Sequence, residues 1–389
     1  MNIMGKNFLL IMDGVSVANK RRGGQGLTGG VIRAICIAQQ LKKLGFNVGI
    51  LTSKAGKEVC EKFDLSANYY MSSYPYYYSI LTVFRGTLGS VRLPAGLKDY
   101  EGTVYSTTEH IYNVIPAVRL KWRNRNKLVV VAHWVAPIKR TGTSVLNGIL
   151  YFINQRLGYL LIKKYADVVL AVSDSTAESL AVVGIAKDKI KSVKCGIDFT
   201  EIRAVSVSAG EPYDAIFMKH FSATKGIFDV IDIWEQVVKS KPEAKLGLIG
   251  TGTESTIEKL EQIITEKDLE DNIDIIGPIY DFKKKFSLLA GSKLFLLPSY
   301  EENWAIVIGE ALAAGLPVIC YDLPEIRPIW GNHAIWVPIG DTKKFATEVV
   351  ELLSNDKKRK TLSEEGIKFV RKFDWENIAK EELSLIFQT

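Results

Sequence analysis

Short apolar runs alternate with amphipathic segments along most of the chain. Near-continuous apolar runs predict buried strands, and apolar residues spaced by three and four predict helices. The predicted strands are residues 8–14, 47–52, 103–108, 127–133, 166–173, 214–220, 244–250, 272–277, 293–299 and 316–322. The clearest predicted helices between them are residues 31–45, 226–240, 253–267 and 304–315. This alternation predicts parallel, doubly wound sheets with helices on both faces.

The alternation lapses once, over residues 199–213, which are polar, rich in small residues and weakly periodic. We interpret them as a linker between two Rossmann-like domains, residues 1–198 and 214–373. Residues 374–389 form one more predicted helix, which either stays with the second domain or crosses back to the first. The fold class is therefore α/β, with two tandem doubly wound domains. Ligands of such sheets bind outside the carboxyl ends of the strands, so a cleft between the domains is the expected site.

Composition is that of an ordinary globular protein, with 47% apolar and 24% charged residues in 389. The net charge of +7 suits an acidic partner such as a nucleotide or an anionic lipid surface, although general basicity explains it equally. No recognised reader motif is present, which disfavours nucleic acid. Asp13 interrupts the first apolar run, so this run predicts a strand, not a signal peptide. Four widely spaced cysteines indicate buried thiols in a reducing, cytoplasmic setting.

A glycine-rich segment at residues 24–29 matches the pattern Gly-x-Gly-x-x-Gly. Its context does not fit a dinucleotide site, because about ten residues separate it from the strand and no acidic residue ends the second strand. The better hypothesis is a basic loop that leads to a helix N-terminus near Gly29 and Gly30, which would bind a phosphate. A surface loop with solvated charges is the alternative.

The most informative segment lies between Pro298 and Pro317. A predicted strand ends at Pro298, a loop carries Glu301 and Glu302, and Asn303 is the predicted cap of the next helix. Carboxylates accept hydrogen bonds from sugar hydroxyls, and a helix N-terminus attracts a phosphate. An ordinary turn with solvated glutamates is the alternative from the residues alone.

The pattern Pro-Ser-x-x-Glu … Glu-Ala-x-Ala-x-Gly-x-Pro-Val over residues 298–318 resembles the Glu-x7-Glu signature of the retaining GT-B glycosyltransferases of family four, also called group 1. The resemblance implies that Glu302 contacts the donor sugar and that Glu310 holds the nucleotide ribose. The family has Gly-Phe-Gly after the first glutamate, and this chain has Asn303, Trp304 and Ala305 at these donor-binding positions. This departure leaves the donor sugar open.

Residues 220–226 resemble the family's Gly-Arg-Leu-x-x-x-Lys-Gly motif. The resemblance implies that Lys225 neutralises the departing diphosphate. The family's arginine corresponds to His220, a weaker and pH-dependent cation. Either Lys219 assists it or the phosphate site is unusual.

The same resemblance implies a place in the donor site for three further residues. Gly250 follows the second strand of the donor domain, and Ile275 belongs to the strand that flanks the nucleotide base. His133 follows the strand 127–133 at the position of a histidine that touches the donor sugar. The alternative for His133 is an ordinary packed loop histidine.

The resemblance implies metal-independent transfer from a UDP- or GDP-sugar with retention of configuration, by attack on the face from which the diphosphate leaves. The nucleotide sugar is a substrate, so no cofactor is expected, and the chain contains no Asp-x-Asp metal motif. Rival functions on the same fold are a phosphorylase, a disaccharide synthase, a UDP-sugar epimerase and a non-catalytic sugar-nucleotide binding protein.

The N-terminal half carries candidate acceptor and membrane features. Residues 68–78 contain six tyrosines, residues 121–127 form a basic cluster around Trp122, and residues 144–165 predict a helix with a large apolar face. Aromatic residues mixed with Lys and Arg suit a membrane interface. The hypothesis is a glycan or lipid-linked acceptor, with peripheral contact to an anionic membrane on its cytoplasmic face. An aromatic core with solvated charges is the alternative.

Overall fold

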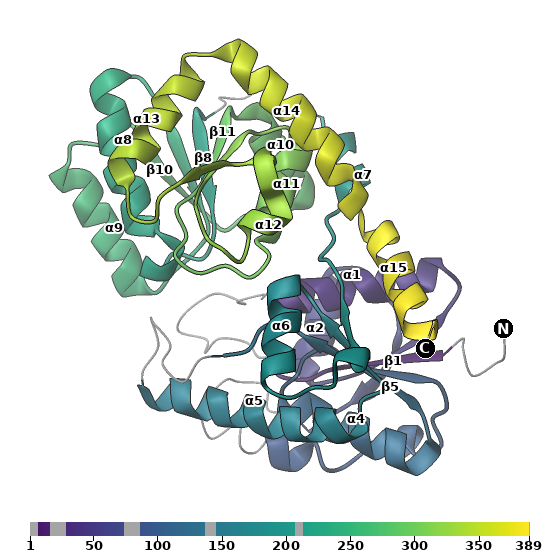
Figure 1. Cartoon of the computed structure of the whole chain (residues 1–389). Helices are drawn as coiled ribbons and strands as arrows, with labels where there is room; N and C mark the ends of the chain where they lie inside the picture. The colour runs from purple at the N-terminus through teal and green to yellow at the C-terminus, as the bar shows by residue number, and fades with distance from the viewer. Residues whose placement is uncertain (1–6, 16–28, 74–85, 137–144, 207–212, 389) are drawn as a thin grey trace. The chain divides into compact units, whose positions relative to one another are not determined.

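The computed structural model describes residues 7–15, 29–73, 86–136, 145–206 and 213–388. The chain divides into two compact units (Figure 1). Unit 1 comprises Met1–Cys195 and Trp375–Thr389, and unit 2 comprises Gly196–Asp374. The glycine-rich loop before Gly29 and the tyrosine-rich residues 74–85 lie outside the described residues. Within the described ranges, no helix has the length and apolar character needed to cross a membrane.

Unit 1 is built on a seven-stranded parallel sheet in the order β3-β2-β1-β4-β5-β6-β7. Its strands are β1 (Asn7–Met12), β2 (Asn47–Thr52), β3 (Asn68–Met71), β4 (Thr103–Ser106), β5 (Lys127–Ala132), β6 (Val168–Ala171) and β7 (Ile190–Ser192). Its main helices are α1 (Gly29–Lys43), α2 (Lys54–Lys62), α4 (Ile111–Asn124), α5 (Val145–Tyr165), α6 (Asp174–Val182) and α15 (Trp375–Phe387). The strand order reverses between β1 and β4, which makes this the ligand-binding position of a doubly wound sheet.

Unit 2 repeats the plan with six parallel strands in the order β10-β9-β8-β11-β12-β13. The strands are β8 (Ala215–Met218), β9 (Leu246–Ile249), β10 (Ile273–Gly277), β11 (Leu294–Leu297), β12 (Val318–Tyr321) and β13 (Ile335–Val337). The helices are α7 (Phe199–Ala204), α8 (Ile227–Ser240), α9 (Glu254–Glu266), α10 (Phe282–Gly291), α11 (Ile306–Ala314), α12 (Arg327–Trp330), α13 (Thr342–Leu353) and α14 (Asp356–Val370). The order reverses here between β8 and β11.

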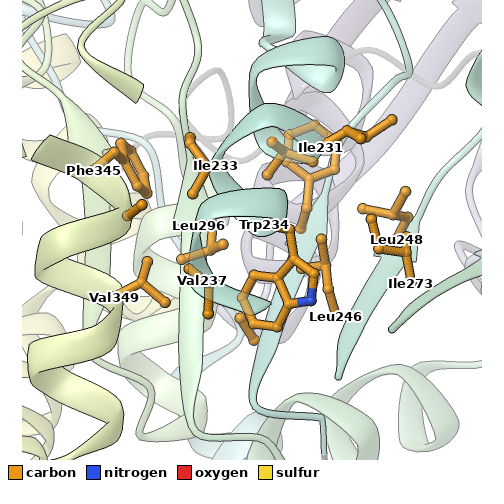
Figure 2. Close-up of a cluster of buried hydrophobic side chains, with 14 of the residues drawn as sticks. Ile231, Ile233, Trp234, Val237, Leu246, Leu248, Ile273, Leu296, Phe345 and Val349 are labelled. Carbon is orange, nitrogen blue, oxygen red and sulfur yellow. The ribbon is translucent and has the colours of Figure 1, made fainter. Parts of the chain in front are cut away.

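One face of the second sheet is covered by α8 and α13. Trp234 of α8 is fully buried and lies among Leu246, Leu296 and Val349 (Figure 2). A fully buried aromatic side chain of this size contributes several kcal/mol to the stability of its domain, since truncation of a buried Phe or Trp costs about 3–5 kcal/mol. The core thereby fixes the strands whose ends carry the candidate site.

The predicted α/β class and the two doubly wound sheets are confirmed. The ten predicted strands all exist, with ends that differ by a few residues. The strands β3, β7 and β13 were not predicted. All three are short edge strands that are only partly buried. The sequences of β3 and β7 lack the continuous apolar run of an interior strand, and β13 is apolar but only three residues long.

The predicted linker at 199–213 is wrong over its first residues. Phe199–Ala204 is the helix α7, in which Ile202 is buried. Arg203 donates a hydrogen bond from Nη1 to the carbonyl of Ala313 at 3.2 Å, which ties α7 to α11. A six-residue segment whose large apolar residues are Phe199 and Ile202 is too short to predict a helix from sequence, and the tertiary contacts supply the stability.

The C-terminal helix α15 belongs to unit 1 and packs on α1. Arg33 of α1 forms an ion pair with Glu382 of α15, and both side chains are almost fully buried. Tyr105 of β4 completes the network: its hydroxyl accepts from Arg33 Nη1 at 3.1 Å and donates to Glu382 Oε2 at 2.9 Å. Because each charge has a partner, the network can lie inside the unit.

Candidate active site

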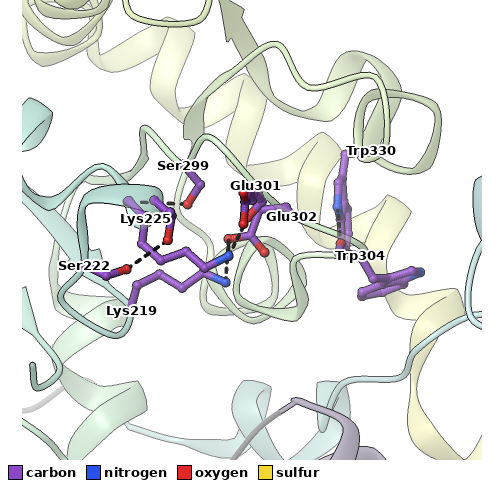
Figure 3. Close-up of polar contacts among 9 residues, drawn as sticks. Lys219, Ser222, Lys225, Ser299, Glu301, Glu302, Trp304 and Trp330 are labelled. Atoms are coloured by element: carbon purple, nitrogen blue, oxygen red, sulfur yellow. Dashed lines mark hydrogen bonds and ion pairs between the residues drawn. The ribbon is translucent and has the colours of Figure 1, made fainter. Parts of the chain in front are cut away.

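Two loops at the switch point of the second sheet bring three charged side chains together. Lys219 and Lys225 follow β8, and Glu302 follows the adjacent strand β11. Glu302 Oε1 lies 2.8 Å from Lys219 Nζ and 3.2 Å from Lys225 Nζ (Figure 3). Lys225 Nζ also donates to the carbonyl of Glu301. The structure therefore joins Lys225 and Glu302, which stand 77 positions apart in the chain.

Two ammonium groups surround the Glu302 carboxylate in this cluster. Burial alone would raise the pKa of the Glu302 carboxyl, but the two ammonium groups outweigh it and hold this pKa below its ordinary value. Burial lowers the pKa of Lys225, and Glu302 opposes that effect. With Glu302 ionised, the two cations share its carboxylate, and the carboxylate of Glu301 also acts on Lys225. The two ammonium groups are the members of the cluster that can bind a phosphate.

Two glycines allow these loops to approach each other. Gly226 has φ 73°, and a Cβ at this position would lie 1.8 Å from the carbonyl oxygen of Pro298. Gly250 has φ 150°, and a Cβ would lie 1.9 Å from the carbonyl oxygen of Lys219. A side chain at either position would push the Lys219–Lys225 loop away from its neighbours. Gly250 thus supports the backbone of a charged residue in the cluster.

His220 does not join the cluster. Its side chain is exposed, and partial desolvation lowers the pKa of its imidazole below the ordinary value, which leaves it uncharged at neutral pH. Lys219 provides the second cation beside Glu302 instead. Of the two alternatives left open by the sequence, the geometry favours assistance by Lys219.

Glu310 lies on α11 and pairs with Lys285 of α10, with 3.0 Å between Oε1 and Nζ. Asp198 is close to this pair. Burial raises the pKa of Asp198 to about 7, and the nearby carboxylates of Glu201 and Glu310 add to the rise. Glu310 is therefore one member of a second charged group in unit 2, beside α11.

The aromatic ring of Trp304 is turned into the core of unit 2. Its centroid lies 4.7 Å from the ring of Trp330 and 5.3 Å from that of Phe373, and the ring is buried. The carbonyl of Trp304 accepts a hydrogen bond from Trp330 Nε1 at 2.9 Å (Figure 3). Only the backbone of Trp304 remains for a ligand contact. Asn303, next to it, is exposed.

The predicted cap Asn303 is wrong, because Ala305 is the N-cap of α11 and makes no side-chain capping bond. Ala305 has φ 55° and ψ 62°, in the left-handed region. A non-glycine residue there costs roughly 1–2 kcal/mol. The strain arises because the turn between β11 and α11 requires a conformation suited to glycine.

Replacement Ala305→Gly is expected to raise the free energy of unfolding by about 0.5–1 kcal/mol, since relief of the left-handed strain exceeds the added backbone entropy. Urea denaturation measures the change. Ala311→Gly, in the interior of the same helix, is the matched control and should lower stability by about 1 kcal/mol. Destabilisation by both replacements would refute the strain at Ala305.

Ile275 of β10 is partly buried and packs against the core of unit 2. Its side chain thus has a structural role, and its backbone remains for contact with a ligand. No site in the described residues brings together three His, Cys, Asp or Glu side chains in an arrangement that could hold a metal ion.

In unit 1, Gly30 and His133 lie against each other. A Cβ on Gly30 would stand 3.0 Å from His133 Nε2, so the first turn of α1, which begins at Gly29, needs glycine to approach the imidazole. His133 Nε2 donates to the carbonyl of Thr107 at 3.0 Å. Burial lowers the pKa of His133, which favours the neutral ring. The structure therefore places a helix N-terminus and a neutral histidine side by side.

Sequence reasoning missed two buried carboxylates at the same edge of this sheet. Glu109 accepts hydrogen bonds from the backbone N–H of His133 at 3.2 Å and from Gln155 Nε2 at 2.8 Å. Asp13, directly after β1, accepts from Ser72 Oγ at 2.6 Å. Polar residues that end two adjacent strands were the available signal.

Burial raises the pKa of Asp13 to about 7, against an ordinary value of 3.8. Because this pKa is higher in the folded state, the folded state binds the Asp13 proton more tightly than the unfolded state does. The resulting stabilisation is fully present below about pH 4 and is lost as the pH rises through 7. Asp13→Asn is therefore expected to be more stable than the wild type by about 1–2 kcal/mol at pH 8 and to lose this advantage near pH 4. Urea midpoints at both pH values test this, with exposed Asp99→Asn as the control. If the urea midpoints of wild type and Asp13→Asn changed equally between the two pH values, the prediction for Asp13 would be contradicted.

Comparison with known proteins gives two family matches. Residues 27–201 match the family described as Glycosyltransferase Family 4, and residues 198–369 match the family described as Glycosyl transferases group 1. The two matches meet near the boundary between unit 1 and unit 2.

Curated relatives are distant. The phosphatidyl-myo-inositol mannosyltransferase of Mycobacterium leprae is 26% identical over 220 residues, which cover 54% of this chain and 56% of the relative. The putative colanic acid biosynthesis glycosyltransferase WcaL of Salmonella typhimurium is 25% identical over 242 residues, covering 59% of this chain and 58% of the relative. The chain thus spans about half the length of the curated relatives it matches.

Among solved structures, the complex of Anabaena HepE with UDP superposes with a TM-score of 0.74 at 16% identity. The superposition covers 99% of this chain and 100% of the HepE chain. At this identity the similarity establishes the fold.

Proposed function

The chain belongs to the group 1 glycosyltransferases, family four, with the GT-B fold, and from this membership we propose that it transfers a sugar from a nucleoside diphosphate sugar to a glycan or lipid-linked acceptor. The observation that carries the proposal is the cluster of Lys219, Lys225 and Glu302 at the switch point of the second sheet. The two ammonium groups of this cluster fit a diphosphate, and its carboxylate fits sugar hydroxyls.

We assign the diphosphate to Lys225 and Lys219, with Gly250 and the backbone of residues 303–305 around it. Glu302 is assigned to the donor sugar, Glu310 to the ribose, and the backbone of Ile275 to the base. A diphosphate that binds the two ammonium groups would compete with Glu302 for them. The Glu302 carboxylate would then be available to the sugar.

In the proposed reaction, the acceptor oxygen bonds to the anomeric carbon while the bond from that carbon to the diphosphate breaks. The proton of the acceptor hydroxyl passes to the leaving phosphate, and both groups lie on the same face of the sugar, so the configuration is retained. The cations stabilise the charge that develops on the leaving oxygen. His133 is assigned to the donor sugar, with Gly29 and Gly30 beside it, and the transfer requires no metal.

UDP or GDP is the proposed nucleotide. UDP is bound by the similar HepE structure, and the mannosyltransferase and glycosyltransferase relatives support sugar transfer as the class of reaction. The proposed location is the cytoplasm, with peripheral contact to its membrane face.

A thermal-shift screen with UDP, GDP, ADP and their sugars tests the donor assignment. A ligand that binds only the native state at 100 times its Kd adds about 2.7 kcal/mol of stability, so one nucleotide should raise Tm clearly above the others. Transfer from the matching sugar to glycan and lipid acceptors then tests the reaction, and NMR of the product tests retention. Activity that disappears in EDTA would contradict metal independence, and no shift with any nucleotide would contradict the donor site.

A further inference from the structure

Tyr300 lies two positions before Glu302 in the loop between β11 and α11, and it has no part in the proposed transfer. The residue is 40% exposed, yet its hydroxyl donates to Asp229 Oδ2 at 2.6 Å. Its ring packs edge-on against that of Tyr321, with the centroids 5.5 Å apart. A hydrogen bond of this length to a carboxylate is of the strong, charge-assisted kind. The exposed side chain is therefore held in one place.

Asp229 is itself anchored to the core of unit 2. It lies in the first turn of α8, where the helix dipole favours a negative charge. The hydroxyl of Tyr321, a buried residue of β12, donates to the same Oδ2 at 2.6 Å. The hydrogen bond to Asp229 and, after it, partial burial raise the pKa of Tyr300 to about 12, so its hydroxyl keeps the proton that it donates. Asp229 thus offers a fixed acceptor to Tyr300.

Backbone contacts attach the same loop to the segment of Lys225. The backbone N–H of Tyr300 donates to the carbonyl of Thr224 at 2.9 Å. Ser299 Oγ lies 3.5 Å from the carbonyl oxygen of Lys225 (Figure 3). Such contacts form with many residue types, whereas the bond to Asp229 requires the hydroxyl of Tyr300. This side-chain bond holds the loop just before Glu302, whose carboxylate lies 3.2 Å from Lys225 Nζ.

We infer that Asp229 is a positioning residue of the candidate donor site, which holds the hydroxyl of Tyr300 and thereby keeps the Glu302 carboxylate between the two lysine ammonium groups. Neither Asp229 nor Tyr300 is assigned a contact with the donor, because both act through Glu302. The effect on catalysis rests on the proposed sugar transfer, whereas the effect on the loop does not. Precise placement matters, since a displacement of about 1 Å can cost about 100-fold in rate.

Tyr300→Phe removes the hydroxyl, keeps the ring and should lower kcat for sugar transfer about tenfold. Tyr321→Phe is the matched control, because the hydroxyl that it removes binds the same oxygen of Asp229 but belongs to a strand. Its kcat should stay within about twofold of the wild type. Both variants lose one hydrogen bond to one carboxylate, so a purely structural role would lower Tm and kcat alike in the two.

Two changes of Asp229 extend the test. Asp229→Ala removes the acceptor and should lower kcat as much as Tyr300→Phe does. The double variant should be no slower than either single variant, because both changes break one interaction. Asp229→Asn keeps an acceptor oxygen for the hydroxyl and should restore kcat to within about threefold of the wild type. Nucleotide Kd from thermal shift should change by less than about threefold in every variant, since both lysines remain.

Hydrogen exchange measures the loop without reference to the reaction. The probe is the peptide that contains the amide of Tyr300, which is hydrogen-bonded in the structure. Tyr300→Phe and Asp229→Ala should speed its exchange by about tenfold or more, because a hydrogen bond to a charged group adds at least that factor to an opening equilibrium. Tyr321→Phe should leave the exchange within about twofold of the wild type.

Unchanged exchange of this peptide in Tyr300→Phe would overturn the inference. Equal losses of kcat in Tyr300→Phe and Tyr321→Phe would also overturn it, as would additive losses in the double variant. Failure of the proposed function has a different signature, since the wild type would then transfer no sugar and bind no nucleotide. The exchange of the loop would still decide whether Asp229 holds it. If Asp229→Ala did not fold, Tyr300→Phe and its control would decide alone.

Discussion

Lys225→Ala is expected to reduce kcat for sugar transfer by about 10²–10³-fold, the usual effect of removing one preorganised group that stabilises developing charge. The ammonium group of Lys225 is directed into the cluster by Glu302, at 3.2 Å, and by the carbonyl of Glu301. Lys219 remains beside Glu302 in this variant, so the carboxylate keeps a partner and the fold should persist. Steady-state kinetics with the donor identified by thermal shift measures the effect.

A matched control for this experiment is Lys239→Ala, an exposed lysine of α8 that pairs with Glu235 in its own helix. Its kinetics should equal those of the wild type. Lys225→Ala with wild-type kcat/KM would remove Lys225 from the proposed mechanism.

The same assay distinguishes Lys219 from His220. Lys219→Ala should cost about 10²-fold, because it removes one of the two cations of the cluster. His220→Ala should change kcat/KM by less than about fivefold near pH 7.5, since a neutral exposed imidazole adds little to phosphate binding. The opposite order of effects would show that the histidine replaces the family's arginine.

Glu382→Ala is expected to lower the free energy of unfolding of unit 1 by about 3–5 kcal/mol, because it leaves the guanidinium of Arg33 buried without its anion. It also removes the acceptor of the Tyr105 hydroxyl at 2.9 Å. Urea denaturation followed by circular dichroism measures the loss. Glu381→Ala, the exposed neighbour on α15, is the control and should change stability by less than about 0.5 kcal/mol.

A double variant provides a sharper test of the buried pair. Arg33→Met with Glu382→Leu removes both charges and should be less destabilised than Glu382→Ala alone, since no unpaired charge stays buried. Additive losses from the two single changes would show that the residues do not interact. That result would contradict the packing of α15 on α1.

The residues of the candidate donor site in unit 2 show how much of a site local sequence motifs can predict. The spacing from Glu302 to Glu310 and the position of Lys225 follow from local motifs, because the strand-to-helix turns that present them are short. The role of Lys219 was left open, since a motif aligns backbone positions and says little about which of two adjacent side chains points inward. The orientation of Trp304 could not be predicted from the motif either. Its ring lies in the core because it packs there against the rings of Trp330 and Phe373.

By itself, the sequence determined the α/β class, the two doubly wound sheets, the family and the loops that carry the candidate donor site. These features depend on hydrophobic periodicity and on motifs within some twenty residues, which are local in the chain. Only the tertiary structure decided the pairing of Arg33 with Glu382, the pairing of Glu302 with Lys219, and the burial of the Trp304 ring. Such contacts join residues tens to hundreds of positions apart, and burial depends on what packs against a residue, so neither is encoded in a local pattern.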